Sequence, residues 1–210
     1  MSICNFDYFL PPLSAYPKGT GLCSFRISLT ISLTLNILRV NFLAFKGDLM
    51  KLLFITPPMG NWAPWGVRHL ACNSLYSQVA AFVREKKSAD VEVLDCRALG
   101  FNDSEMLEEV RKRRPDAVFF GSVIPAAGGA AQLNRFHAAM KRIKEIAPQT
   151  ITVGGGLMYT AIPREIMQEN PQLDFVIVGV FGDNEYTLWE LLEELKNPAP
   201  KLSEIKGLAY

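Results

Sequence analysis

Between residues 50 and 197, short apolar runs alternate with longer segments in which apolar residues recur every three or four positions. The short runs predict strands, and the longer segments predict helices with one buried face. Strands are expected at 51–56, 91–94, 116–123, 150–156 and 175–179, and helices at 67–87, 103–114, 133–147, 162–169 and 188–195. Asp103 is expected to cap the second helix. Because apolar strands are typical of sheets covered on both faces, the pattern predicts a doubly wound α/β fold. Its sheet would be mostly parallel and five-stranded, in the flavodoxin-like order 2-1-3-4-5.

The stretch from Pro115 to Gly156 carries the most information about function. It contains a strand, a small-residue loop, a helix and a second strand, which together predict a right-handed crossover unit. Both strands end in residues with little or no side chain, Gly121-Ser122 and Gly154-Gly155-Gly156. In an open α/β sheet, ligands bind beyond the carboxyl ends of the strands, where the strand order reverses. The loop 57–66, the Ser122 loop and the three glycines are therefore expected to border one crevice.

The two ends of the chain differ from this regular part. Residues 1–49 contain no Glu and many Ser, Thr, Leu and Pro residues, and the apolar segment 27–38 is too short and too polar to cross a bilayer. An anchor, a structural arm and a stretch without real structure are the three interpretations. We expect the last, because residues 46–49 can be back-translated into a ribosome-binding sequence just before Met50. Residues 50–197 would then form the domain, and 198–210 would begin a linker to a missing catalytic domain.

Composition narrows the class of partner. The formal net charge is +1, with basic and acidic residues interspersed, so no basic surface is predicted for nucleic acid. The four cysteines (Cys4, Cys23, Cys72 and Cys96) show no CxxC spacing, which favours free thiols over a metal centre or disulfides. We expect a cytoplasmic protein that binds neither nucleic acid nor membranes.

The familiar ligands of this fold do not fit the strand ends. A phosphoacceptor domain needs acids where this chain has Thr56-Pro57 and Gly121-Ser122. A flavodoxin wraps phosphate in backbone N–H groups after the first strand, and Pro57-Pro58 removes two of these donors. A dinucleotide site needs GxGxxG after the first strand, where it is absent. A large, mostly neutral ligand that approaches the backbone closely at glycine remains the best fit.

Several motifs resemble those of one family. Ser122-Val123-Ile124, followed by Gly154-Gly155, is similar to the SxL and GG motifs of cobalamin-binding domains. The succession PDAVFFGS, TITVGGG and QLDFVIVG resembles the N-terminal cobalamin-binding domain of B12-dependent radical SAM enzymes in particular. ITPP after Met50, APWG and the final GLAY fit the same branch. The resemblance implies that cobalamin contacts Pro57, Pro58, Trp65, Gly66, Ser122, Val123, Ile124, Gly154, Gly155, Gly156, Gly182, Asp183 and Glu185.

The chain departs from the family pattern at two places. The DxHxxG motif that supplies a cobalt-ligating His in other cobalamin domains is absent, and neither His69 nor His137 has the required neighbours. The resemblance therefore implies base-off cobalamin without a His ligand. After the fifth strand the family carries GEGE, for which Gly182, Asp183 and Glu185 are the best match here.

The resemblance implies a cobalamin-binding domain of a truncated B12-dependent radical SAM enzyme. The parent would perform methyl transfer or related radical chemistry, with its iron–sulfur cluster and S-adenosylmethionine in the missing barrel. These 210 residues offer no catalytic set of their own. Two alternatives stay open: a ligand-free flavodoxin-like interaction module, and a flavin- or nucleotide-dependent α/β enzyme. Ser122 could also be only a small residue at a crowded strand end, and the three glycines could form only a tight turn.

Overall fold

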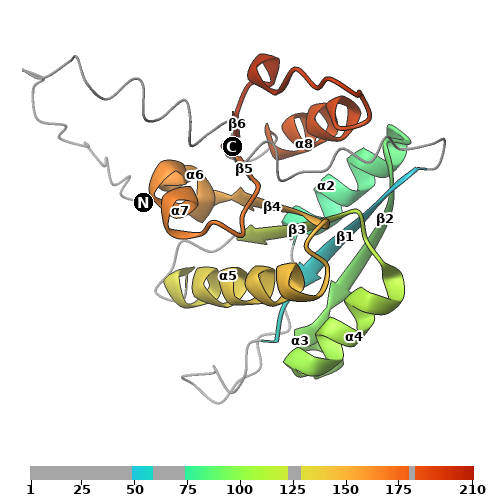
Figure 1. The fold of residues 1–210 in the computed structure, drawn as a ribbon, viewed down its shortest axis with the longest axis vertical. Coiled ribbons are helices and arrows are strands. Elements are labelled where there is room, and N and C mark those ends of the chain that lie inside the picture. The colour runs from blue at the N-terminus through green and yellow to red at the C-terminus, as the bar shows by residue number, and fades with distance from the viewer. Residues whose placement is uncertain (1–48, 59–73, 123–128, 180–182) are drawn as a thin grey trace, which may run out of the picture. The chain divides into compact units, whose positions relative to one another are not determined.

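The described part of the chain is built around one twisted sheet (Figure 1). A computed structural model describes residues 49–58, 74–122, 129–179 and 183–210, all within one compact unit that spans residues 41–210. In these residues the sheet has six strands in the order β2-β1-β3-β4-β5-β6. The strands are β1 (Met50–Thr56), β2 (Ala89–Asp95), β3 (Ala117–Ser122), β4 (Ile151–Gly156), β5 (Phe175–Ile177) and β6 (Leu208–Ala209). The first five are parallel and follow the predicted order, so the predicted fold class is confirmed.

Helices cover both faces of the sheet. On one face α2 (Ser74–Glu85) packs against α8 (Asp183–Glu194), and the two reach the sheet through β2, β3 and β5. The other face carries α3 (Cys96–Leu99), α4 (Asp103–Arg113), α5 (Gly129–Ile146), α6 (Leu157–Ala161) and α7 (Pro163–Glu169). This two-sided covering explains why the strands are apolar on both faces.

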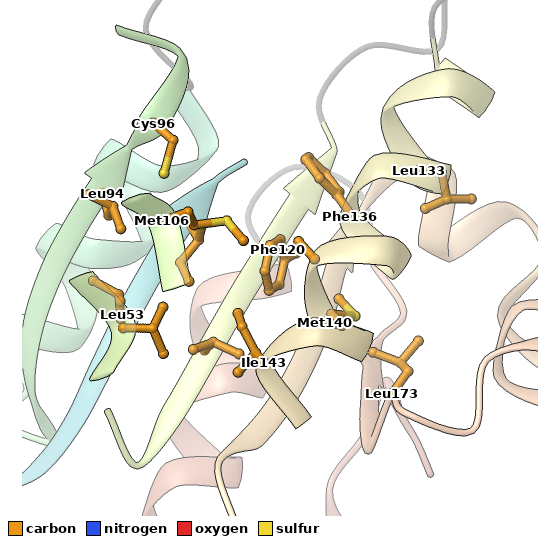
Figure 2. Close-up of a cluster of buried hydrophobic side chains, with 14 of the residues drawn as sticks. Leu53, Leu94, Cys96, Met106, Phe120, Leu133, Phe136, Met140, Ile143 and Leu173 are labelled. Atoms are coloured by element: carbon orange, nitrogen blue, oxygen red, sulfur yellow. The ribbon is translucent and has the colours of Figure 1, made fainter. Parts of the chain in front are cut away.

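A large hydrophobic cluster lies between the sheet and the second set of helices (Figure 2). Leu53, Leu94 and Phe120 come from the strands, and they meet Met106 of α4 and Met140 of α5. The predicted apolar face of α5 is confirmed for Leu133, Phe136, Met140 and Ile143, which are all buried. Ala147, predicted as its last member, follows the helix and is half-buried.

Two aspartates tie the strands together at the opposite end of the sheet from the glycines. The carboxylate of Asp116 accepts a hydrogen bond from the Lys51 backbone N–H at 2.8 Å. The carboxylate of Asp174 accepts from the Thr152 N–H at 2.8 Å and from Lys144 Nζ at 2.6 Å. Side chains thus fix the amino ends of these strands.

The start of α4 corrects the prediction that Asp103 caps this helix. The N-cap is Asn102, whose Oδ1 accepts hydrogen bonds from the backbone N–H groups of Ser104 and Glu105. The Glu105 carboxylate accepts from the Asn102 N–H at 2.7 Å, which completes a capping box. Asp103 lies one residue later, in the first turn, where its negative charge interacts favourably with the helix dipole.

The tail of the chain adds structure that the sequence did not predict. Residues 202–204 form the 3-10 helix η2 (Leu202–Glu204), and β6 pairs antiparallel with β5. Leu202 and Ile205 are buried, and the Thr187 hydroxyl donates to the Lys206 carbonyl oxygen at 3.1 Å. A sixth strand therefore covers the β5 edge. In the described part of the chain, no helix is both long enough and apolar enough to cross a membrane.

Candidate functional site at the strand ends

The carboxyl ends of β1, β3, β4 and β5 form the candidate site, which we call the strand-end site. The β1–β3 ladder runs from Leu52↔Ala117 to Phe54↔Phe119 and goes no further. The β3–β4 ladder continues to the last residues, with Gly121↔Gly155 and Ser122↔Gly156 in register. The ends of β1 and β3 are therefore no longer paired at the predicted switch point, whereas the glycine-rich ends of β3 and β4 remain paired.

A tyrosine hydroxyl stands where the ladder between β1 and β3 stops. Tyr76 of α2 donates to the Ile55 carbonyl oxygen at 2.6 Å and accepts from the Gly121 N–H at 3.1 Å. Burial raises the pKa of this phenol above its usual range, so the hydroxyl keeps its proton. Its ring packs against Phe54 and Phe119, with centroids 5.3 Å and 6.1 Å away.

The glycines of this site are packed against side chains of the protein itself. A Cβ on Gly121 would lie 2.7 Å from Cδ2 of Leu75 and 3.0 Å from Cε1 of Tyr76. One on Gly155 would lie 2.6 Å from Cζ of Phe119 and 2.9 Å from Oδ1 of Asn184. A side chain at either position would collide with Leu75, with the rings of Tyr76 and Phe119 or with the Asn184 amide unless these groups shifted, so the packing favours glycine.

Tyr159 occupies the space beside Gly154 on the other face of the sheet. A Cβ on Gly154 would lie 2.7 Å from Cδ1 of this ring. The Tyr159 hydroxyl is buried and has no hydrogen-bond partner in the described part of the chain. Burial raises the pKa of Tyr159 well above its usual range, so this group is an uncharged, unsatisfied polar atom near the site.

Two polar side chains join the ends of β4 and β5. The Asn184 Oδ1 accepts from the Gly156 N–H at 3.1 Å, and its Nδ2 donates to the Gly179 carbonyl oxygen at 3.2 Å. The Thr160 hydroxyl accepts from the Gly179 N–H at 2.9 Å and lies 3.0 Å from the Gly156 carbonyl oxygen. Gly156 has a φ of +89°, which turns the chain from β4 into α6 and favours glycine. This clamp fixes the backbone at the strand-end site.

The first turn of α8 carries a buried carboxylate oxygen. Oε2 of Glu185 has no hydrogen-bond partner among the described residues, although the side chain as a whole is only half-buried. Asp183 begins the same helix. Both were predicted from the acidic stretch after the fifth strand, and the helix start places them next to the end of β5.

Apart from the half-buried Glu185, the predicted site residues divide into three groups. Pro57, Pro58, Gly154, Gly155 and Gly156 are buried at the strand ends. For Ser122 and Asp183 the structure places the backbone, at the end of β3 and at the start of α8. The predicted residues Trp65, Gly66, Val123, Ile124 and Gly182 lie outside the described residues.

Sequence reasoning missed the side chains that organise the site, namely Tyr76, Tyr159, Thr160 and Asn184. A weak signal existed for Tyr76, because it lies three and seven residues before Val79 and Val83 on the buried face of α2. Tyr76 meets Gly121, Asn184 meets Gly156 and Thr160 meets Gly179 across 45, 28 and 19 positions, whereas the contacts of Thr160 with Gly156 and of Asn184 with Gly179 are local.

His137 lies in the interior, in the middle of α5. Its ring packs edge-on against Tyr159, with centroids 5.8 Å apart, and its Nε2 has no hydrogen-bond partner in the described residues. Burial lowers the pKa of His137 to about 4, so the imidazole is neutral at physiological pH. Among the described residues, no three or more His, Cys, Asp or Glu side chains are grouped to hold a metal ion. The strand-end site offers backbone amides, hydroxyls and a carboxylate, which can hydrogen-bond to a polar ligand.

Comparison with known proteins identifies a related family. A family model described as the B12 binding domain matches residues 76–191, which is more than half of the chain. The anaerobic magnesium-protoporphyrin IX monomethyl ester cyclase of Cereibacter sphaeroides is 25% identical over 171 residues, which cover 77% of this chain and 25% of the cyclase. The chain therefore spans about a quarter of the length of that relative.

Two solved structures share the fold. The cobalamin-dependent S-adenosylmethionine radical enzyme OxsB with aqua-cobalamin bound has a TM-score of 0.60 at 18% identity, covering 78% of this chain and 21% of OxsB. The radical S-adenosylmethionine methyltransferase TsrM from Kitasatospora setae, with cobalamin and a 4Fe-4S cluster bound, has a TM-score of 0.58 at 19% identity. That match covers 76% of this chain and 29% of TsrM. The resemblance predicted from the sequence motifs is confirmed.

Proposed function

The chain belongs to the B12-binding domain family, and from this membership we propose that it binds cobalamin at the strand-end site. The observation that carries the proposal is the register of the two glycine-rich strands. Gly121↔Gly155 and Ser122↔Gly156 lie side by side, directly next to the point where the β1–β3 ladder ends. Parallel α/β sheets bind ligands at such a point, and strand ends without side chains allow a bulky ligand to approach the backbone.

The polar groups near the site are compatible with cobalamin. Oε2 of Glu185 and the hydroxyl of Tyr159 are buried without a partner in the described residues. A buried unsatisfied polar atom is costly, and a ligand that carries amides and hydroxyls can satisfy it. We propose that the cofactor is held by the described residues Pro57, Pro58, Ser122, Gly154, Gly155, Gly156, Asp183 and Glu185. Trp65, Gly66, Val123, Ile124 and Gly182 would complete the site from the loops.

We also propose that cobalamin is bound base-off, without a protein imidazole on its cobalt. The DxHxxG motif is absent from the sequence. The side chain of His137 is enclosed between α5 and Tyr159, so it cannot serve as a ligand without unpacking the interior. His69 lies outside the described residues.

The similar proteins suggest the setting in which the domain acts. OxsB and TsrM are radical S-adenosylmethionine enzymes, and this chain covers less than a third of each. We propose that residues 50–197 are the cobalamin-binding part of such an enzyme. A radical SAM barrel beyond residues 198–210 would hold the iron–sulfur cluster, S-adenosylmethionine and substrate. Bound cobalamin would supply methyl transfer or related radical chemistry there, while the residues described here bind and orient it.

A titration of the full chain with hydroxocobalamin, followed by visible absorbance, tests the proposal. We expect saturable uptake with a base-off spectrum, and no comparable uptake of FMN or NAD. The Co(II) form should give an EPR spectrum without nitrogen superhyperfine splitting, unchanged in His69→Ala and His137→Ala. Tight FMN binding without cobalamin uptake would overturn the proposed function. Nitrogen splitting that disappears in either His variant would overturn only the proposal that no protein imidazole binds the cobalt.

A further inference from the structure

The ladder between β1 and β3 stops for two identifiable reasons. In the register set by Leu52↔Ala117 and Phe54↔Phe119, the next rung would join the Gly121 N–H directly to the Ile55 carbonyl oxygen. The rung after it would join the N–H of residue 57 to the Gly121 carbonyl oxygen. Residue 57 is Pro57, which has no N–H, so this second rung cannot form.

Tyr76 replaces the first of these rungs. Its hydroxyl donates to the Ile55 oxygen at 2.6 Å and accepts from the Gly121 N–H at 3.1 Å. The donor and acceptor directions of a hydroxyl oxygen diverge, so the two bridged backbone atoms are held beyond direct hydrogen-bonding distance. The hydroxyl thus satisfies both buried backbone groups and keeps the two strands apart.

The surroundings of Tyr76 fix its ring in this position. Gly121 has no Cβ where the ring passes, and Phe54 and Phe119 pack against it. Only 2% of Tyr76 is exposed, so water does not compete for the hydroxyl. An unpaired Ile55 carbonyl or Gly121 N–H would be costly here, which makes the bridge stable.

We propose that Tyr76 is a positioning residue for the cofactor, because its hydroxyl acts as a spacer that holds the ends of β1 and β3 apart. This inference rests on the proposed function and identifies a residue that neither the motifs nor the family resemblance indicates. Tyr76 shapes the strand-end site through the strand backbones, and Pro57 assists by preventing the next rung.

Tyr76→Phe tests the spacer with almost no change in volume. Without the hydroxyl, the Gly121 N–H and the Ile55 carbonyl oxygen satisfy each other directly, and the ends of β1 and β3 close. We expect cobalamin to bind about tenfold more weakly in the absorbance titration. By NMR, the Gly121 amide should stay protected from hydrogen exchange, because it gains a direct partner. Tyr186→Phe, an exposed tyrosine on α8, is the matched control and should bind cobalamin like the unchanged chain.

Pro57→Ala provides an independent test if Tyr76→Phe does not fold. The new N–H allows the ladder to continue, so this variant should be more stable to urea. Pro57 is itself proposed to contact cobalamin, so the gain in stability is the readout that separates a longer ladder from a lost contact. A simple loss of structure would lower stability and affinity together.

The outcomes distinguish the inference from the proposed function. Unchanged affinity in both variants, with cobalamin bound by the unchanged chain, would overturn the spacer and leave the proposed function standing. No cobalamin uptake by the unchanged chain would overturn the proposed function and the positioning role with it. Rapid exchange of the Gly121 amide in Tyr76→Phe would show that the strand ends do not close, and would overturn the spacer mechanism by itself.

Discussion

At the scale of single residues, Gly154 illustrates how a strand-end glycine can serve packing as well as ligand approach. The ring of Tyr159 lies where the side chain of residue 154 would be, and a Cβ there would be 2.7 Å from Cδ1. The sequence interpretation assigned the three glycines to ligand approach, with a tight turn as the open alternative. At Gly154 and Gly155 the packing role is visible in the structure, and the ligand role remains the proposal made above.

Gly154→Ala should destabilise the domain because neither the strand nor the buried ring can move away easily. Overpacking of this kind costs about 1–3 kcal/mol. Urea denaturation of the variant should show this loss. In the background of Tyr159→Ala, which removes the ring, the same glycine substitution should cost much less, since the two residues are in contact. Equal costs in both backgrounds would mean that the ring does not restrict residue 154.

His137 should make the stability of the domain depend on pH. Burial lowers its pKa in the folded protein to about 4, whereas an unfolded His titrates near 6.5. The unfolded state therefore binds the proton first, and stability falls as the pH drops from about 6.5 towards 4. The loss is on the order of 2–3 kcal/mol by pH 4.

His137→Leu provides the measurement for this pH effect. Urea denaturation at pH 7 and pH 4.5 should show a smaller difference for the variant than for the unchanged chain. The substitution also removes an Nε2 that has no hydrogen-bond partner in the described residues, so stability at pH 7 should not fall sharply. The same pH dependence in both proteins would place the responsible group elsewhere.

At the scale of elements, hydrophobic periodicity was sufficient to predict the helices and strands whose burial follows a regular spacing. It predicted β1 to β5 and the buried face of α5, because both depend on local spacing. It did not find α6, whose five residues follow directly after Gly156. The prediction that Asp103 caps α4 was wrong by one residue, because Asn and Asp both cap helices and only the geometry shows that Asn102 does so here.

The strand-end site could be predicted in outline for the same reason. The strand order follows from the alternation of strands and helices between residues 50 and 197, and the glycines at the ends of β3 and β4 are readable from residues 115–156. The side chains that bridge these ends are not, since Tyr76 meets Gly121 across 45 positions and Asn184 meets Gly156 across 28. Such contacts depend on which helices cover which face, and the local pattern does not determine them.

At the scale of the whole molecule, the tail beyond the last helix contributes to the fold. The sequence interpretation treated residues 198–210 as the beginning of a linker, because they contain proline and follow a helix. In the structure β6 pairs with β5, and the Val178 N–H donates to the Gly207 carbonyl oxygen at 2.7 Å. Leu202 and Ile205 are each only 7% exposed. The tail therefore completes one edge of the sheet.

Replacing both buried side chains of the tail, in Leu202→Ala/Ile205→Ala, should destabilise the domain by about 3 kcal/mol or more. Each truncation removes a buried aliphatic side chain, and such losses cost about 2–5 kcal/mol in a well-packed interior and less near an edge. The measurement is urea denaturation of the full chain followed by circular dichroism. Lys201→Ala/Lys206→Ala is the matched control, because both of its side chains are exposed, and it should change stability little. If the Leu202/Ile205 variant were as stable as the unchanged chain, the tail would only rest on the surface. If it is destabilised, β6 and η2 belong to the cooperative unit, and the boundary of the cobalamin-binding domain moves beyond residue 197.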